Sequence, residues 1–307
     1  MIIPPIKSQG IKTKIVPTIN RIIDSATEPF IGDWYEPFFG TGVVGFNSPV
    51  KGCKIVGDTN PHLIRFYNAV LDGTINEGSV REYLEDAHRK LSAADQEGYA
   101  YYRKIRDRFN SEHDPFDFLF LSRAGFNGMI RFNSKGEWNI PFCKKKERFA
   151  QAYVTKICNQ VKAVKTIIQD GDWEFNNVSF EETISKAGKN DLIYSDSPYF
   201  GRYADYYNTW TETDEERLCE ILTKSKARFI LSTWHHNQYR ENPLINRLWS
   251  KFNIITQEHF YHGGGKIENR NSMIEALVFN FDIDEQRFNT PSQELVLFND
   301  KDIHSIL

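Results

Sequence analysis

The sequence contains little cysteine, no long apolar run and no excess of one charge. Its 307 residues include 4 Cys, none in a C-x-x-C pair, which argues against a disulfide framework or a cysteine zinc site and predicts reduced thiols. No apolar run approaches the roughly 20 residues that span a bilayer, and the N-terminus lacks the apolar stretch of a signal peptide. We therefore expect a cytoplasmic protein that is not bound to a membrane.

The charge balance limits how this chain could bind nucleic acid. The sequence has 38 Lys and Arg against 41 Asp and Glu, which gives a net charge of −3. Any binding to nucleic acid must then come from basic residues gathered in one place. Hydrophobic residues make up 40% of the chain and aromatic residues 14%, which is enough for a buried core. The length suits two modest domains, or one α/β domain with a large insertion.

Apolar, β-branched runs alternate with helical patterns along much of the chain. Residues 34–46 pass from an apolar run through two glycines into small residues, which is typical of a buried strand that turns tightly into a helix. The alternation predicts an α/β fold. The expected strands are 53–57, 191–195, 228–232, 253–260 and 273–283, with a short one within 173–180, and the expected helices are 11–25, 61–71, 150–168 and 213–225.

The segment between about 68 and 146 departs from this alternation. Residues 77–110 are polar, charged and helical in pattern. Residues 122–142 contain two short β-like runs that flank Asn133-Ser134-Lys135-Gly136, a hairpin turn in which Gly136 would take a positive φ. We interpret this segment as an inserted lobe.

Two features of the first half indicate a nucleoside-bearing cofactor. Gly40-Thr41-Gly42 follows a strand and would let a ligand approach the backbone closely, and Asp58, at the end of the next strand, could accept hydrogen bonds from two ribose hydroxyls. Each feature alone is also compatible with an ordinary tight turn. A phosphate-binding loop is disfavoured, because no Gly-Lys-Ser/Thr follows and Glu36 adds negative charge.

The most specific signal is Asp196-Ser197-Pro198-Tyr199, at the end of an apolar strand. A carboxylate, a backbone carbonyl held extended by the following proline, and an aromatic ring form a receptor for a planar amine. Two acceptors would draw both hydrogens of the amine and aim its lone pair at an electrophile, a mechanism that needs no metal. A strand end with a capping Asp and a proline turn is the structural alternative.

Four motifs in this order carry a family resemblance. They are EPFFGTG, GDTN, SRAGFNGMIRFN followed by GEWNIPF, and SDSPY. Over residues 6 to 281 the chain resembles the Dam-like (class alpha) DNA adenine methyltransferases. The resemblance implies S-adenosylmethionine as methyl donor, and a doubly wound, mostly parallel Rossmann-like domain at 1–67 and 151–290. It also implies a helical and β-hairpin target-recognition domain at 68–150, leaving 291–307 as a C-terminal extension.

The resemblance also implies roles for particular residues. Asp196, Ser197, Pro198 and Tyr199 match the catalytic motif, with Ser197 where the family has its first proline. The residues implied to bind the cofactor are Ser8, Lys12, Glu36, Pro37, Phe38, Gly40, Gly42, Asp58, Asn60, Ser179, Phe180 and Asp196. Three other positions depart from the family pattern: an aromatic residue is usual at Ser8, a glycine at Ile11 and an aspartate at Ser179.

The inserted segment is where the resemblance places DNA contacts. The implied DNA-binding residues are Arg123, Asn127, Met129, Arg131, Pro141 and Lys144, and the basic run 144–148 would attract the phosphate backbone. Because the target amine of duplex DNA is stacked and paired, the base must be flipped out. We expect the partner to be double-stranded DNA and the protein to act as a monomer. We also expect it to belong to a bacterial restriction-modification or phage system, in the former alongside an endonuclease that cuts the same site.

Several alternatives remain open. The same receptor could hold the N4 amine of cytosine or an adenine of RNA, and a catalytically silent DNA-binding relative would keep the fold. A nicotinamide-dependent dehydrogenase is disfavoured, because G-x-G-x-x-G is absent. His235-His236 is interpreted as a polar loop, so no metal site is expected. Further candidates for base or DNA contact are Tyr206, Tyr207, Trp210, Lys266 and Arg270.

Overall fold

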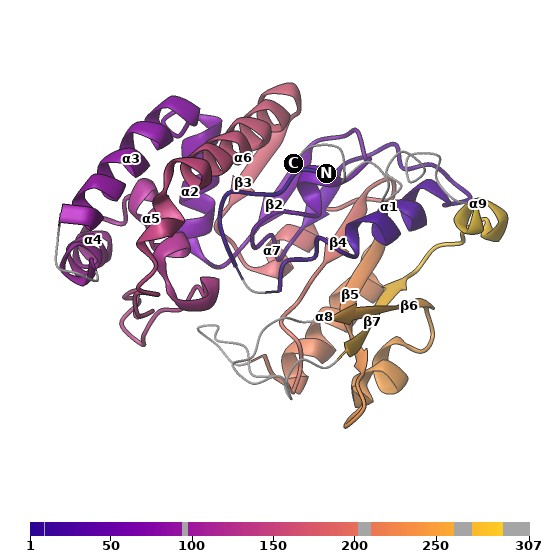
Figure 1. Ribbon diagram of the computed structural model, residues 1–307. Coiled ribbons are helices and arrows are strands. Elements are labelled where there is room, and N and C mark those ends of the chain that lie inside the picture. Colours follow the sequence, from indigo (N-terminus) through magenta and orange to yellow (C-terminus); the bar gives the residue numbers. More distant parts are fainter. Residues whose placement is uncertain (9, 94–97, 202–209, 261–271, 291–307) are drawn as a thin grey trace, which may run out of the picture.

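A seven-stranded sheet forms the centre of the computed structural model, which describes residues 1–8, 10–93, 98–201, 210–260 and 272–290 (Figure 1). The strand order is β3-β2-β1-β4-β5-β7-β6. Strands β1 to β5 pair in parallel, whereas β7 runs antiparallel to both β5 and β6. The strands are β1 (Trp34–Glu36), β2 (Lys54–Gly57), β3 (Trp173–Asn176), β4 (Leu192–Ser195), β5 (Arg228–His236), β6 (Asn253–Phe260) and β7 (Ser272–Phe279).

Helices cover both faces of the sheet, so it is doubly wound. One apolar cluster joins one face to α1 (Val16–Asp24), α2 (Pro61–Leu71) and α6 (Gln151–Asp170). A second cluster joins the other face to α7 (Phe180–Ser185), α8 (Glu212–Lys224) and the π-helical turn η4 (Ile245–Trp249). A short helix, α9 (Glu285–Asn289), packs against α1. This architecture confirms the predicted α/β, mostly parallel, Rossmann-like fold.

Most predicted elements are present with shifted ends. The first helix begins at Val16 rather than at residue 11, with Pro17 in its first turn as expected. The expected helix after the glycine turn was wrong, because only a 3-10 turn, η1 (Gly45–Asn47), lies between β1 and β2. The helical stretch 77–110 is two helices, α3 (Glu77–Ala93) and α4 (Tyr99–Glu112).

The lobe inserted between α2 and α6 consists of α3, α4, α5 (Pro115–Ala124) and a hairpin, with short turns η2 (Phe126–Gly128) and η3 (Lys146–Phe149). Figure 1 shows it at the left of the sheet, with β6 and β7 at the opposite side. Its core is continuous with the α1, α2 and α6 side of the sheet. The fully buried Asp117 accepts hydrogen bonds from Arg108 and Tyr83, which ties α5 to α4 and α3.

The hairpin forms at the predicted place. Asn133 N donates to Glu137 O at 2.8 Å, and Phe132 and Trp138 form an antiparallel bridge. Gly136 takes the predicted positive φ, at +79°. Farther from the turn, Phe126 N donates to Pro141 O at 2.9 Å, and Cys143 N donates to Ala124 O at the same distance. The hairpin is therefore anchored to the end of α5.

The composition predicts reduced cysteines and no membrane-spanning segment. Cys53, Cys143, Cys158 and Cys219 are all free thiols. Across the residues that the structure describes, no helix combines the length and the apolar character needed to cross a membrane.

Candidate active site

The strand order reverses between β1 and β4. β1 is followed along the chain by β2 on one side, and β4 continues the sheet on the other. In open α/β sheets, ligands bind beyond the carboxyl ends of the strands at such a switch point. The glycine turn follows β1, Asp58 follows β2 and Asp196 follows β4. The topology thus brings the predicted cofactor and catalytic motifs to one edge of the sheet.

The two glycines of the turn after β1 differ in their surroundings. Both take a positive φ, +51° at Gly40 and +77° at Gly42. A Cβ added at Gly40 would meet nothing within 4 Å, so Gly40 borders open space. A Cβ at Gly42 would lie 2.2 Å from the ring of Phe39, so Gly42 is required by packing beneath the turn. Gly40 is therefore the position where a ligand can approach the backbone.

Asp58 is held against this turn. Its Oδ2 accepts from Gly40 N and its Oδ1 from Asn60 N, both at 2.7 Å. Burial raises the pKa of Asp58, and the two backbone hydrogen bonds oppose that shift. Each carboxylate oxygen keeps a second lone pair. The carboxylate is thus fixed beside the open space at Gly40 and can still accept hydrogen bonds from a ligand.

Asn60 and Ser179 serve as helix caps. Asn60 Oδ1 accepts from His62 N at 3.0 Å and begins α2, with Pro61 in the first turn. Ser179 Oγ accepts from Glu182 N at 3.4 Å and begins α7. Both residues lie at the ligand edge of the sheet, after β2 and β3. Their side-chain oxygens already organise local backbone.

Glu36 and Phe38 lie at different depths. Glu36 is 2% exposed, and its Oε2 accepts from Trp34 Nε1 at 3.0 Å beneath the glycine turn. Burial raises the pKa of Glu36 well above its usual value. Phe38, two residues later, stacks on Phe180 with ring centroids 5.3 Å apart, and Trp210 meets Phe38 edge-on. Pro37 between them is buried. An aromatic wall therefore stands beside the cofactor edge.

The catalytic motif is bound to the N-terminal segment through Lys12. Lys12 Nζ lies 2.9 Å from Asp196 Oδ1 and 4.6 Å from the centre of the Tyr199 ring. The Tyr199 hydroxyl donates to Glu275 Oε1 at 2.9 Å, from β7. Ser197 is buried and Pro198 half-buried between them. One ammonium thus contacts both the carboxylate and the ring of the predicted amine receptor.

The environment of Asp196 is poorly hydrated. Its side chain is 21% exposed, and burial raises its pKa to about 6. Lys12 lowers this pKa through its charge and a hydrogen bond, and Glu275 raises it through like charge. Asp196 is therefore ionised at neutral pH and becomes protonated in mild acid.

Ser8 and Ile11 lie in the same N-terminal segment as Lys12. Ser8 is half-buried and precedes Gly10, which takes a φ of +76°. Ile11 is half-buried against the main apolar cluster. Lys12 of this segment contacts the catalytic motif through Asp196 and Tyr199.

Arg123 occupies an internal position, unlike the expectation that it contacts DNA. Its Nε donates to Pro5 O at 2.7 Å, its Nη2 donates to Pro5 O as well, and Nη2 donates to Gln160 Oε1 at 2.7 Å. Burial lowers the pKa of Arg123 to about 10. Arg123 therefore connects the N-terminal segment to α5 and α6.

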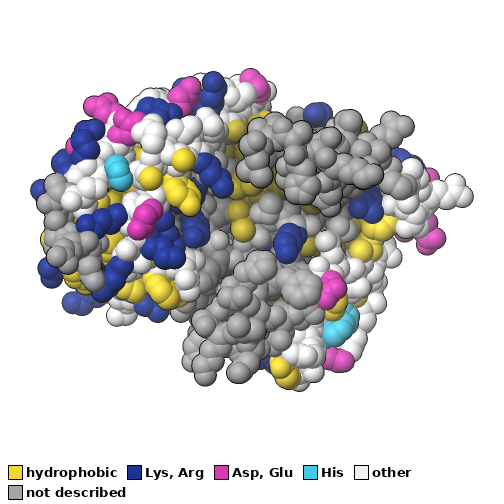
Figure 2. Space-filling model, in the orientation of Figure 1, with side chains coloured by type: hydrophobic (Ala, Val, Ile, Leu, Met, Phe, Trp, Pro, Cys, Tyr) yellow, Lys and Arg dark blue, Asp and Glu magenta, His cyan; other side chains and the backbone are white. Residues whose placement is uncertain are grey.

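The remaining DNA candidates lie on the hairpin. Asn127, Pro141 and Lys144 are exposed, and Met129 and Arg131 are half-buried. Asn127 and Lys144 take positive φ values of 54° and 58°, which non-glycine residues adopt rarely. Arg131 Nε donates to Asn139 Oδ1 at 3.0 Å across the hairpin. In the view of Figure 2, Lys and Arg side chains are numerous on this lobe.

The structure describes the histidine pair but not four of the further contact candidates. His235 and His236 end β5 rather than lying in a loop, and their Nδ1 atoms are 2.8 Å apart. Within the described part of the chain, no group of three or more His, Cys, Asp or Glu is arranged to hold a metal ion. Tyr206, Tyr207, Lys266 and Arg270 lie outside the described residues.

Sequence reasoning missed Glu275 and Trp234. Trp234 lies beyond the predicted strand 228–232, which the structure extends to His236, and Glu275 lies near the start of the predicted strand 273–283. A charged residue in this apolar run was a local signal for Glu275, but it did not reveal the partner. Their contacts with the catalytic loop depend on the pairing of β5 with β7. Trp234 Nε1 donates to Phe200 O at 3.0 Å, directly after Tyr199.

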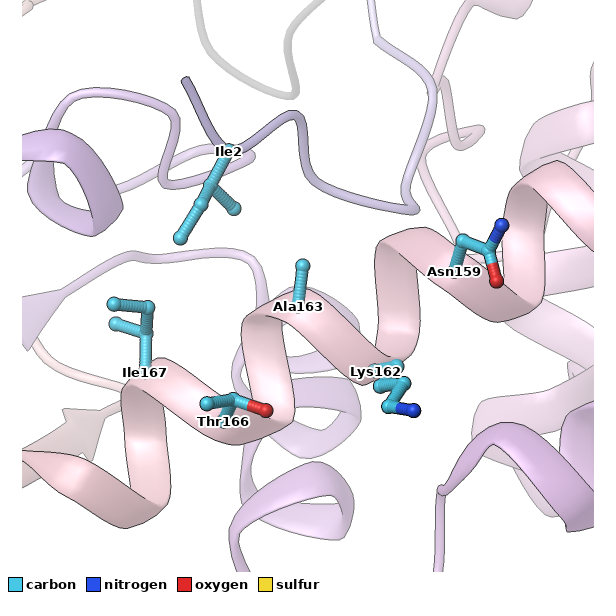
Figure 3. A pocket seen from close by; sticks show the side chains of 6 residues that line it. All are labelled: Ile2, Asn159, Lys162, Ala163, Thr166 and Ile167. Carbon is cyan, nitrogen blue, oxygen red and sulfur yellow. The ribbon is translucent and has the colours of Figure 1, made fainter.

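A surface depression of about 420 Å³ lies away from the switch point (Figure 3). Ile2 reaches from the N-terminal segment towards α6, and Ala163 points back from the helix. The lining residues are Ile2, Asn159, Lys162, Ala163, Thr166 and Ile167. It shares no residue with the catalytic or cofactor motifs.

Comparison with known proteins gives consistent relatives. The chain is 32% identical to the DNA adenine methylase of Haemophilus influenzae over 201 residues, which is 64% of this chain and 63% of that protein. It is 28% identical to the type II methyltransferase M.FokI of Planomicrobium okeanokoites, across 90% of this chain and 42% of the relative. It is 24% identical to the type II methyltransferase M1.LlaDCHI of Lactococcus lactis subsp. cremoris, across 91% and 95%. The first two matches thus span less than two thirds of those relatives.

A family model gives the broadest match. It describes the D12 class N6 adenine-specific DNA methyltransferases and matches residues 8–262. This range contains the glycine turn, Asp58, the inserted lobe and the tetrapeptide at 196–199. The chain therefore belongs to the D12 class N6 adenine-specific DNA methyltransferase family.

Proposed function

We propose that the protein transfers a methyl group from S-adenosylmethionine to the N6 amine of an adenine in double-stranded DNA. The observation that carries the proposal is the position of Asp196 and Tyr199. They follow β4 at the switch point, across from the open space at Gly40 and the fixed carboxylate of Asp58. An amine receptor and a nucleoside-binding edge thus adjoin each other.

The residues at this edge fit S-adenosylmethionine. Asp58 would accept from its ribose hydroxyls, Lys12 would pair with its carboxylate, and Gly40 leaves space for close approach. Phe38 and Phe180 offer apolar surface for its adenine. When bound, the cofactor would supply an electrophilic methyl group and leave as S-adenosylhomocysteine, and the methylated amine would lose one hydrogen as a proton.

Asp196 and Tyr199 would orient the target amine. The ionised Asp196 accepts one amine hydrogen and the Ser197 carbonyl the other, which directs the nitrogen lone pair towards the methyl group. The Tyr199 ring would stack on the base. Because Asp196 is poorly hydrated, its charge acts on the amine with little screening by water.

The inserted segment 68–150 is our proposed target-recognition domain. Arg131 and Asn127 are residue types that read base edges, and Lys144 with the exposed Lys145 would contact phosphate. The positive φ values at Asn127 and Lys144 support a functional role, because such strain collects at binding sites. Flipping the target adenine out of the duplex costs a few kcal/mol. Contacts between this hairpin and the DNA would offset that cost. We leave Arg123 out of the proposed interface, since its Nε and Nη2 donate to the Pro5 carbonyl and to Gln160.

The test is incubation of the purified protein with tritiated S-adenosylmethionine and unmethylated genomic DNA, followed by nucleoside chromatography. We expect label in N6-methyladenine, and none with Asp196→Ala. Label in N4-methylcytosine would move the substrate to cytosine, and label only on RNA would move it to RNA. Absence of all label, with cofactor binding shown by calorimetry, would identify a silent relative and contradict the proposal.

The biological setting follows from the same proposal. A duplex DNA substrate implies action at the nucleoid, in the cytoplasm of a bacterial or phage-infected cell. Two of the relatives are named type II methyltransferases, which supports a restriction-modification system with an endonuclease of the same specificity. We propose that the protein acts as a monomer, testable by light scattering with and without DNA.

A further inference from the structure

The catalytic loop rests on a pair of buried residues from two strands at the far side of the site. Trp234 of β5 and Glu275 of β7 stand directly opposite each other in an antiparallel register. Residues paired in this way project to the same face of a sheet. Trp234 is 2% exposed and Glu275 is 0% exposed. The pair therefore forms a buried polar platform within the sheet.

Both members of the pair bind the loop that follows β4. Glu275 Oε1 accepts from the Tyr199 hydroxyl at 2.9 Å, and Trp234 Nε1 donates to Phe200 O at 3.0 Å. Arg240 extends the platform, because its guanidinium lies over the Trp234 ring and Nη1 donates to Gly201 O at 2.9 Å. Three consecutive residues, Tyr199 to Gly201, are thus held from one side.

Burying a carboxylate on an interior strand is costly unless the group is hydrogen-bonded. An apolar side chain at 275 would match the neighbouring positions of β7, where Ala276, Leu277 and Val278 are all buried. The Tyr199 hydroxyl gives the Glu275 carboxylate a strong, charge-assisted partner. The sequence therefore retains a costly residue at a position whose side chain accepts from the Tyr199 hydroxyl.

We propose that Glu275 is a positioning residue for methyl transfer: it fixes the ring of Tyr199 in the plane on which the target base stacks, and Trp234 fixes the backbone beside it. Glu275 does not touch the base or the cofactor in this arrangement. It acts on the ring through the hydroxyl, while the ammonium of Lys12 contacts the ring 4.6 Å from its centre. The inference rests on the proposed function.

The geometry predicts which step depends on Glu275. A Tyr199 ring that is already held in one plane loses no further conformational freedom when the base stacks on it. Alignment of the amine with the methyl group depends on that stacking. Loss of the anchor should therefore lower the rate of methyl transfer while cofactor binding is unchanged, because Glu275 contacts none of Asp58, Gly40 and Lys12 in the hydrogen bonds described above. A merely structural role would lower stability and leave the turnover of the folded protein intact.

The experiment compares Glu275→Leu, Glu275→Gln and Tyr199→Phe with the wild-type protein, using tritium transfer to unmethylated DNA. We expect Glu275→Leu and Tyr199→Phe each to lower kcat by about 10- to 100-fold, as loss of one charge-assisted hydrogen bond would. The Kd for S-adenosylmethionine should stay within about twofold in both. Glu275→Gln keeps an acceptor for the hydroxyl, so at pH 8 it should keep kcat within about threefold of wild type. The double variant Tyr199→Phe/Glu275→Leu should be no slower than the slower single variant, because both changes remove one interaction.

Glu258→Leu is the matched control. It removes a carboxylate from the neighbouring strand β6, where Glu258 is exposed, and should leave kcat unchanged. A folded Glu275→Leu protein with wild-type kcat would overturn the inference, and so would Glu275→Gln that is as slow as Glu275→Leu. If Glu275→Leu does not fold by circular dichroism, Tyr199→Phe at the wild-type rate would overturn it. Failure of the wild-type protein to label adenine would instead overturn the proposed function.

Discussion

Lys12 Nζ lies 2.9 Å from Asp196 Oδ1, although the two residues are 184 positions apart in the sequence and come from the N-terminal segment and the end of β4. The side chain of Lys12 is only 6% exposed, so this ion pair is largely shielded from water. It connects the segment implied to bind the cofactor carboxylate with the carboxylate implied to bind the target amine. The pair therefore makes the protonation of Asp196 sensitive to Lys12.

The first prediction concerns the pH dependence of methyl transfer. The pKa of Asp196 is about 6, and its ionised form is a much stronger acceptor for the amine hydrogen than the protonated carboxyl group. We expect kcat/KM to rise with pH through about 6 and then level off. The charged or titratable groups around Asp196 are Lys12, Glu275, Glu36 and Tyr194, from four separate parts of the chain.

Substituting Lys12 and substituting Glu275 should move the acid limb of the pH profile in opposite directions. Lys12 lowers the pKa of Asp196, so Lys12→Met should shift the limb to higher pH. Glu275 raises that pKa, so Glu275→Gln should shift it to lower pH. Lys14→Met, at an exposed position of the same segment, is the control and should leave the limb in place. A limb that stays near pH 6 in Lys12→Met would show that Asp196 is not the titrating group.

A second prediction separates the two glycines of the cofactor turn. Gly42→Ala would place a Cβ 2.2 Å from the Phe39 ring, so the protein should lose several kcal/mol of unfolding free energy. Gly40→Ala meets no atom within 4 Å and carries only the cost of its positive φ, on the order of 1 kcal/mol. Because its methyl group enters the proposed cofactor space, Gly40→Ala should instead weaken S-adenosylmethionine binding. Urea denaturation and calorimetry measure the two effects; equal loss of stability in both variants would contradict this assignment.

The catalytic and cofactor-binding residues could be predicted from the sequence more fully than the residues that hold them in position. Asp196 to Tyr199 and Asp58 each follow an apolar strand, so parallel pairing alone brings them to one edge. Lys12 could be placed there by resemblance. Glu275 could not, because its role depends on the antiparallel register between β5 and β7, which local patterns do not determine.

Arg123 shows a second reason why sequence reasoning is incomplete. An arginine in a basic, hairpin-forming region has the chemistry of a DNA contact, and its residue type does not reveal whether it points outward. In the structure, the guanidinium of Arg123 donates to the carbonyl oxygen of Pro5, which lies 118 residues earlier in the sequence. Likewise, the residues after Gly42 were expected to begin a helix but form only the 3-10 turn η1, in which Phe46 packs against Phe39 and Trp173. Val43, Val44 and Gly45 are poor helix formers, and Pro49 ends the stretch.

The third prediction contrasts two arginines of the lobe. Arg123→Met leaves the Pro5 carbonyl and Gln160 without their donor, so it should lower the free energy of unfolding by about 2–3 kcal/mol. Arg131→Ala lies on the hairpin and should change stability by less than about 0.5 kcal/mol. It should weaken DNA binding by about 1–3 kcal/mol and reduce its salt dependence. Denaturation and filter binding distinguish them; normal DNA affinity in Arg131→Ala would remove Arg131 from the interface.

The last prediction concerns acid stability of the lobe. His62 is 6% exposed at the start of α2, and its ring centre lies 4.8 Å from that of Phe109 and 4.9 Å from that of Phe132. Burial, together with the smaller effect of the charges of His113 and Arg65, lowers the pKa of His62 to about 4. An unfolded histidine titrates near 6.5, so below that pH the unfolded state takes up a proton that the folded state refuses. The stability from neutral His62 is therefore complete above pH 6.5 and is lost as the pH falls towards 4.

This loss should amount to about 3 kcal/mol, from roughly 2.5 pH units at 1.36 kcal/mol each. His62→Phe removes the titration and keeps an aromatic ring, so its unfolding free energy should fall less between pH 7.5 and pH 4 than that of the wild-type protein, by about this amount. Phe132→Leu is the control: it disturbs the same packing without changing the titrating group, and should lower stability at both pH values. Urea denaturation at the two pH values measures the difference. Identical acid dependence in wild type and His62→Phe would contradict the prediction. It would mean that His62 takes up its proton in the folded protein through an opening of the aromatic cluster, although His62 is buried.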